Sequence, residues 1–141
     1  MTPQQRSKCM RNIRGKNTKP ELLVRKFLYS KGFRYRLNLK NLPGSPDIVL
    51  KKYKTVIFVN GCFWHGHNNC RYYKEPKTNA IFWRHKILVN KERDLQNLID
   101  LRRQGWHTII LWECQLKSKN RDLTLKGLEK TLCHIYLTDQ K

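Results

Sequence analysis

The sequence predicts an α/β fold in which helices flank a mixed β-sheet. The 141 residues contain four short segments rich in β-branched and aromatic residues and three longer segments of helical periodicity. The expected order is helix, three strands, long helix, strand, helix, and helices in such an arrangement pack on the faces of the sheet. The sequence shows no repeat, low-complexity tract or linker, so residues 20–141 are expected to form a single domain.

The first helix is expected to begin just after Thr18. Thr18 can cap the helix, Pro20 suits its first turn, and Glu21 stands three residues after the cap. Gly32 can close the helix. The residues that form its apolar face are Leu22, Leu23, Phe27 and Leu28. Considered alone, Glu21 is more typical of a capping residue than of a catalytic one.

Three strands are expected next, and an acid stands at the start of the second. Residues 33–37 alternate with period two and predict a half-exposed strand. Residues 46–50 and 55–59 predict an antiparallel hairpin joined by the turn at 51–54. Asp47 lies at the mouth of a buried strand, where an acid is costly unless it is paired, hydrogen-bonded or bound to metal.

A long helix is expected over residues 80–104, and Gly105 ends it. Residues 106–112 then predict a buried strand. Because a helical crossover joins parallel strands, this strand is expected to run parallel to residues 55–59. A last helix is expected over residues 122–137.

The charge balance predicts a polyanionic partner. The chain carries 30 Lys and Arg against 10 Asp and Glu, a net charge of +20. Residues 1–19 contain no acid, and we interpret them as a basic arm that binds a groove of DNA rather than as a solvated terminus. Its bases are Arg6, Lys8, Arg11, Arg14, Lys16 and Lys19. No apolar run approaches the ~20 residues of a membrane span, and no signal peptide is recognised, so we expect a cytoplasmic protein.

Thiols and imidazoles cluster after the second strand of the hairpin. Cys62, His67 and Cys70 follow the spacing C-x₄-H-x₂-C. Cys114 follows the neighbouring strand and should reach the same end of the sheet. Three thiols and one imidazole predict a tetrahedral zinc site without an open position, hence a structural one. His65 is the competing ligand, and scattered buried thiols are the plainer alternative.

Two large aromatic residues, Phe63 and Trp64, lie between the predicted metal ligands. Such residues can cover the end of the sheet as a lid. Alternatively, they can form a wedge that stacks on or between bases, and a mismatched step is the cheapest one to unstack.

Several groups of residues in a fixed order carry a family resemblance. They are Arg6-Ser7-Lys8 with Met10-Arg11, Pro43-Gly44 with Pro46-Asp47, the run from Phe58 to His67, Phe82-Trp83, Asn90-Lys91-Glu92-Arg93-Asp94, Gly105-Trp106 and Trp112-Glu113-Cys114. Together they resemble the very-short-patch repair endonuclease family (Vsr). The resemblance implies a restriction-endonuclease-like core and a nick on the 5′ side of the T in a T:G mismatch. That mismatch arises when 5-methylcytosine deaminates beside a cytosine methyltransferase site.

The resemblance also implies a set of catalytic roles. Asp47 would hold a catalytic Mg²⁺, with the backbone carbonyl of Val59 completing the protein ligation. His65 would act in proton transfer at the attacking water, and Asp94 would orient His65. Glu21 would reach the metal-bound water shell from the first helix.

The remaining implied roles concern the metal loop and DNA binding. Cys62, His67, Cys70 and Cys114 match the structural zinc site of the family. Phe63, Trp64 and Trp83 match aromatics that enter from the major groove, and Met10 matches an apolar contact from the opposite side. Arg11 and Arg14 would bind DNA as part of the basic arm. The partners implied are duplex DNA with a T:G mismatch, mismatch-repair proteins and a cognate cytosine-5 methyltransferase system, for a monomer associated with the bacterial nucleoid.

Two departures from the family pattern concern the loop itself. Asn60 stands where the best-known family member has a histidine, and we expect its amide to hydrogen-bond phosphate or water in the catalytic site. Asn68-Asn69 make the loop one residue longer.

Two other functions stay open on the sequence alone: a restriction-type endonuclease that cuts both strands, and a non-catalytic, zinc-stabilised DNA-binding module. The lack of a Glu-x-Lys after Asp47 argues mildly against the first.

Overall fold

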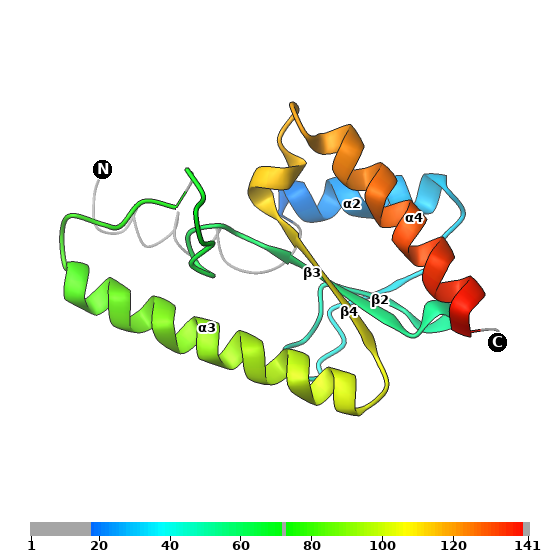
Figure 1. Cartoon of the computed structure of the whole chain (residues 1–141), viewed down its shortest axis with the longest axis horizontal. Coiled ribbons are helices and arrows are strands. Elements are labelled where there is room, and N and C mark those ends of the chain that lie inside the picture. The colour runs from blue at the N-terminus through cyan, green and yellow to red at the C-terminus, as the bar shows by residue number, and fades with distance from the viewer. Residues whose placement is uncertain (1–17, 72, 140–141) are drawn as a thin grey trace.

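A four-stranded mixed sheet forms the centre of the fold (Figure 1). The computed structural model describes residues 18–71 and 73–139, so most of the predicted basic arm, with Met10, Arg11 and Arg14, lies outside the described residues. The strands are β1 (Arg36–Leu37), β2 (Ile48–Leu50), β3 (Thr55–Asn60) and β4 (His107–Trp112), in the order β1-β2-β3-β4. The β1–β2 and β2–β3 pairs are antiparallel, and β3–β4 is parallel. The predicted hairpin and the predicted parallel crossover are therefore both confirmed.

Helices cover the sheet from two sides (Figure 1). They are α2 (Lys19–Ser30), α3 (Ala80–Arg103) and α4 (Arg121–Asp139), with short 3-10 helices η1 (Lys51–Tyr53) and η2 (Glu113–Leu116). Alternate residues of β2 face different cores, as period two requires. Ile48 and Leu50 pack with α2 and α4, whereas Val49 packs with Val56 and with Leu101 of α3. The prediction of a mixed sheet flanked by helices is confirmed.

The start of α2 follows the predicted cap. The Oγ1 atom of Thr18 accepts a hydrogen bond from the backbone N–H of Glu21 at 3.4 Å, and Pro20 lies in the first turn. Gly32 has φ +88°, in the left-handed region that a residue just beyond a helix end commonly adopts. The capped first turn of α2 carries Glu21, whose side chain is buried and belongs to the site described below.

Two strands differ from their predictions. The first strand spans only Arg36–Leu37, both exposed, because Phe33 donates its N–H to Leu28 at the end of α2 and packs into the core. The last strand was predicted to be buried, but Leu111 is its one buried residue. The reason is its place at the edge of the sheet, where only β3 pairs with it.

None of the helices in residues 18–71 and 73–139 combines the length and the apolarity needed to cross a bilayer.

Candidate active site and metal centre

One end of the sheet gathers the predicted site residues. Asp47 immediately precedes β2, and β2 is antiparallel to β3, so Asp47 lies beside the end of β3. Because β4 is parallel to β3, Trp112 at its end is in register with Asn60 at the end of β3. The loop that follows β3 and the 3-10 helix that follows β4 therefore start from the same edge.

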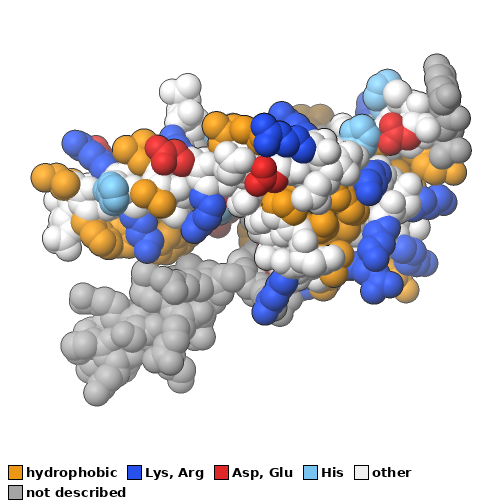
Figure 2. Space-filling view, turned by 90° about the horizontal axis from the view of Figure 1, so that it is seen from below, with side chains coloured by type: hydrophobic (Ala, Val, Ile, Leu, Met, Phe, Trp, Pro, Cys, Tyr) orange, Lys and Arg blue, Asp and Glu red, His pale blue; other side chains and the backbone are white. Residues whose placement is uncertain are grey.

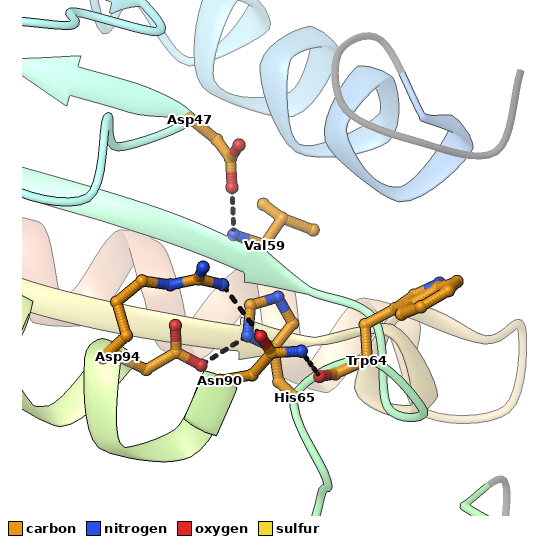
Figure 3. A network of polar contacts seen from close by, with 7 residues as sticks. Asp47, Val59, Trp64, His65, Asn90 and Asp94 are labelled. Atoms are coloured by element: carbon orange, nitrogen blue, oxygen red, sulfur yellow. Dashed lines mark hydrogen bonds and ion pairs between the residues drawn. The ribbon is translucent and has the colours of Figure 1, made fainter. Parts of the chain in front are cut away.

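Asp47 is held by hydrogen bonds from two directions. Its Oδ2 atom accepts a hydrogen bond from the backbone N–H of Val59 at 2.7 Å (Figure 3). Its carboxyl group is also hydrogen-bonded to the side chain of Glu21 from α2. The expectation that an acid at this strand mouth must be paired or bonded is confirmed.

The environment raises the pKa of Asp47 to about 7. Burial is the largest cause, followed by the hydrogen bond with Glu21; the negative charge of Glu21 adds to it, whereas the Val59 amide and the positive charge of Arg25 oppose it. Two carboxyl groups bonded to each other cannot both ionise without cost. A divalent cation at this position would relieve that cost, so the acid pair is suited to holding one.

Glu21 is 2 % exposed and forms an ion pair inside α2. The Nη2 atom of Arg25, one turn further along the helix, lies 3.3 Å from the Oε2 atom of Glu21. The backbone N–H of Glu21 takes part in the helix cap, as its position suggested, but its side chain points into the molecule. Its carboxyl group faces Asp47 at the end of the sheet.

His65 is oriented by a second acid. Its Nδ1 atom lies 2.5 Å from the Oδ2 atom of Asp94 on α3 (Figure 3). The imidazole ring also meets Trp112 edge-on, with 6.4 Å between ring centroids. A carboxylate on Nδ1 favours the tautomer with the proton there and leaves Nε2 as a proton acceptor. The pair therefore has the arrangement of a general base with its orienting group.

One face of α3 holds the loop after β3. Asn90 donates from Nδ2 to the backbone carbonyl of Trp64 at 3.0 Å (Figure 3), and Lys91 donates from Nζ to the Oδ1 atom of Asn68 at 2.8 Å. Asp94 follows Asn90 by four positions and Lys91 by three, so all three residues lie on one side of the helix. The same face carries Trp83 and Ile87. Residues 61–70 are therefore positioned by α3 as well as by the sheet.

The four predicted metal ligands are brought together. One atom each from Cys62, His67, Cys70 and Cys114 lies within 4.8 Å of all the others, and they are the one such group of three or more in the described residues. The Nδ1 atom of His67 is 3.4 Å from the Sγ atom of Cys114. Bonds of 2.0 and 2.3 Å at a tetrahedral angle place such atoms roughly 3.5 Å apart. The donor set and its spacing fit a tetrahedral metal ion, and His65, the competing ligand, lies outside the group.

The surroundings of this metal group favour a structural role. Trp112 stacks on the His67 ring with 4.0 Å between centroids and an angle of 6°. Burial raises the pKa of the Cys62 thiol to about 12 and also raises that of Cys114. Metal binding must therefore displace thiol protons, which metal ions in such sites do. All four ligands come from the protein, so no position remains for a substrate.

A cluster of aromatic rings lies between the loop and the start of α3. Phe63, Trp64 and Trp83 form a triangle with centroid distances of 5.2, 5.5 and 5.7 Å. Phe82 extends it and is 59 % exposed. In Figure 2 hydrophobic side chains gather at the end of the molecule where α3 begins, with Lys and Arg side chains near them. Because this cluster is separate from the two buried cores, it can contact a partner.

Several residues of the site were not predicted from the sequence. Arg25, Asn90 and Trp112 had no assigned role, although Glu21–Arg25 and Asn90–Asp94 show the i, i+4 spacing of paired helix residues. Asn60, which was predicted to bind phosphate or water, is the last residue of β3 and is only 7 % exposed.

Fold and site together define the class of the protein. The pair of buried Glu21 and half-buried Asp47 lies beside the end of β3, and the His65–Asp94 pair involves the loop that follows β3, in a chain of net charge +20. An acid pair suited to a divalent cation, together with an oriented histidine, is an arrangement that can serve phosphodiester hydrolysis. This is the class of the nucleases.

Comparisons with known proteins give the family. The family model described as DNA mismatch endonuclease Vsr matches residues 1–71. The chain is 53 % identical over 118 residues to the Type II nicking enzyme V.NmeAIP of Neisseria meningitidis, with 84 % of each chain covered. It is 38 % identical over 131 residues to the DNA mismatch endonuclease Vsr of Escherichia coli, covering 91 % of this chain and 83 % of that one. The chain belongs to the Vsr family of DNA mismatch endonucleases.

Proposed function

We propose that this protein nicks duplex DNA at T:G mismatches, cleaving the phosphodiester 5′ of the mismatched T in a Mg²⁺-dependent reaction. The nick would begin repair of deaminated 5-methylcytosine. The observation that carries the proposal is that the Asp47–Glu21 pair lies beside the end of β3 while His65, paired with Asp94, lies in the loop that follows β3. Family membership supports DNA cleavage, and names such as Type II nicking enzyme, given to relatives, support a single-strand cut.

Asp47 and the backbone carbonyl of Val59 would hold the Mg²⁺. The N–H of Val59 points to Asp47, and in an antiparallel pair the N–H and C=O of one residue point to the same side. The register Ile48↔Ile57, continued by two residues, brings Pro46 opposite Val59. Proline has no N–H to donate, so that carbonyl remains available to a cation. Glu21 would bind the water shell of the ion, and the ion would stabilise negative charge on the reacting phosphate.

His65 would take the proton of the attacking water. Nδ1 is engaged by Asp94, so Nε2 is the atom that accepts the proton. Asp94 then stabilises the imidazolium that forms. In this proposal Asn60 binds phosphate or water near His65.

Zinc is the metal that we propose for Cys62, His67, Cys70 and Cys114. Three thiolates and one imidazole are a common structural zinc set, and a structural ion suits a loop that contains little regular secondary structure. The ion would connect the loop after β3 to the end of β4. It would thereby fix the segment that carries both the aromatic cluster and His65.

Recognition would depend on the aromatic cluster and the basic arm. Phe63, Trp64 and Trp83 would enter the base stack from the major groove, and Met10 would contact the opposite side. Arg11 and Arg14 of the arm, residues 1–19, would bind phosphates. The catalytic domain, residues 20–141, would act as a monomer in the bacterial cytoplasm, with mismatch-repair proteins and a cognate methyltransferase system as functional partners.

A nicking assay tests the catalytic proposal. Duplexes that differ only in one T:G, T:A or C:G pair are labelled on each strand in turn and incubated with Mg²⁺. The expected product is a single cut 5′ of the T in the T:G duplex. Asp47→Ala should abolish the cut and still bind the mismatch. Cuts in both strands of matched duplexes would instead mean a restriction-type activity, and binding without any cut would mean a DNA-binding module.

A second assay tests recognition by the aromatic wedge. Replacing Phe63 and Trp64 by Ala should reduce the preference for T:G over matched DNA about tenfold or more, because stacking distinguishes the mismatch whereas phosphate contacts do not. Binding constants on T:G and T:A duplexes measure the ratio. An equal loss of affinity for both duplexes would contradict the wedge.

A further inference from the structure

Helix α2 places a guanidinium group inside the candidate active site. Arg25 is 8 % exposed, although arginine is rarely buried unless it is paired. It stands one helical turn after Glu21, which is 2 % exposed. Both side chains therefore lie on the face of α2 that is turned to the protein interior. Arg25 is not among the residues to which the proposed function gives a role.

Three ionisable groups form a chain from α2 to the sheet. The Nη2 atom of Arg25 contacts the Oε2 atom of Glu21 at 3.3 Å. Glu21 in turn is hydrogen-bonded to the side chain of Asp47, and Asp47 is bonded to the amide of Val59. Arg25 is also near enough for its charge to act on Asp47. Contacts with Arg25 and with Asp47 therefore fix the orientation of the Glu21 carboxyl group.

The contribution of this ion pair to stability does not explain its presence. Burying two charges costs several kcal/mol per ion, and apolar replacements of buried ion pairs are often neutral or stabilising. The pair becomes useful if a carboxylate must be held beside Asp47, where two acids would otherwise repel each other.

We propose that Arg25 is a positioning residue for the divalent-cation site: its guanidinium group holds the Glu21 carboxylate against Asp47, so that both acids already face the cation before it binds. This inference rests on the proposed function, in which Asp47 binds Mg²⁺. Arg25 touches neither the cation nor the DNA in this arrangement.

The direction in which cation affinity changes when Arg25 is removed distinguishes a positioning role from an effect of its charge alone. If Arg25 acted only through its positive charge, removing it would strengthen cation binding at a pH above about 8, where Asp47 is ionised, because one repulsive charge would be gone. The binding titrations are therefore carried out above that pH. If Arg25 positions Glu21, removing it lets the carboxylate turn away and weakens binding. Mutation of a residue that orients a metal ligand commonly lowers metal affinity about 10- to 100-fold.

Binding of Mn²⁺, as a substitute for Mg²⁺, tests the inference without any turnover. Free Mn²⁺ is followed by its electron paramagnetic resonance signal in titrations of the zinc-loaded protein. Arg25→Met should weaken Mn²⁺ binding about tenfold. Arg25→Lys, which retains the charge but not the planar fork, should give an intermediate loss. Lys26→Met removes the same charge from the neighbouring exposed residue and should change binding less than about twofold.

A double-mutant cycle with Glu21→Gln shows whether Arg25 acts through Glu21. In the Glu21→Gln background, Arg25→Met should cause little further loss of Mn²⁺ binding. An undiminished loss there, or tighter binding by Arg25→Met alone, would overturn the inference. Thermal unfolding of each variant verifies folding, and Arg25→Lys provides the comparison if Arg25→Met does not fold. Asp47→Ala separates the two levels: if it binds Mn²⁺ as the wild type does, the proposed metal site itself is wrong.

Discussion

Single side chains in this site are held by partners that lie far from them in the chain. Asp47 bonds to the amide of Val59, 12 positions away, and His65 bonds to Asp94, 29 positions away. Each pair gives one functional atom a defined direction. Substitutions at these positions should therefore change chemistry or pH dependence more than they change the fold.

Replacing Asp47 by Asn should remove a pH-dependent cost to stability. The pKa of Asp47 is about 7 in the folded protein against an ordinary value of 3.8, so the folded state binds more protons than the unfolded state between these values. Wild-type stability therefore falls as pH rises from about 4 to about 7. The advantage of Asp47→Asn over wild type should grow by on the order of 2 kcal/mol between pH 5 and pH 8. Urea unfolding without added divalent cation measures it; a difference that is independent of pH would contradict the raised pKa.

Replacing Asp94 by Asn should lower the rate of nicking and leave DNA binding intact. An amide can donate to Nδ1 of His65 and so favour the wrong tautomer, which removes the proton acceptor at Nε2. We expect kcat to fall roughly 10²-fold or more, with an unchanged Kd for mismatched duplex. Asp100→Asn is the matched control, because Asp100 lies on the same helix and accepts a hydrogen bond from Gln96 away from the site. An equal loss in both variants would point to general damage to α3.

Among the elements, α3 has the largest effect on the geometry of the site. Its inner face contacts the loop after β3 through Asn90, Lys91 and Asp94, and its first turn contributes Trp83 to the aromatic cluster. The loop has to approach this face closely at Gly66. That glycine has φ +58°, and a Cβ atom there would come within 2.5 Å of both Ile87 and Lys91 side chains. A glycine is therefore required both by the backbone conformation and by the space available.

Gly66→Ala should separate the loop from α3. The clash and the left-handed backbone together should destabilise the protein by about 1–3 kcal/mol and reduce nicking, since His65 is adjacent. Gly127→Ala is the matched control: a Cβ atom at this position of α4 meets nothing within 4 Å, so the change should stabilise by about 0.5–1 kcal/mol. Thermal unfolding and nicking rates of both variants test the pair. Equal stability of the two variants would show that the loop does not need this close approach.

At the scale of the whole molecule, the metal group joins parts of the chain that the cores do not connect. Cys62, His67 and Cys70 come from the loop after β3, and Cys114 comes from η2 after β4. The two hydrophobic cores lie on opposite faces of the sheet, and Cys62 belongs to neither of them. The loop is held by α3, and a metal ion bound to the four ligands would fix its position further. Metal binding should contribute directly to folding.

Replacing Cys114 by Ser should remove the bound zinc and lower thermal stability. A hydroxyl group is a poor replacement for a thiolate, so the site should lose its ion and the midpoint of unfolding should fall by at least ~5 °C. Cys133→Ser is the control, because Cys133 is exposed and lies outside the metal group. Metal analysis and thermal unfolding measure the two effects. A full complement of zinc in Cys114→Ser would mean that the ligand set is wrong.

Much of the fold could be predicted because it depends on neighbours in the chain. Apolar periodicity located α2, the hairpin, α3 and α4 to within a few residues, and Thr18 marked the start of α2. The metal ligands were predictable for a related reason, since three of the four lie within nine residues of sequence. The exposure of β4 was not predictable in this way, because an apolar strand has the same sequence pattern at the centre and at the edge of a sheet.

The sequence by itself determined the order of the elements, the basic character of the protein, its family resemblance and the four side chains that gather as a metal group. Only the tertiary structure decided that Glu21 is buried against Asp47, that Arg25 accompanies it, and that one face of α3 holds the loop. The physical reason is the distance along the chain over which the interactions act. Helix and strand formation follow local periodicity and capping, whereas the partners of a buried charge depend on which elements the sheet order brings together.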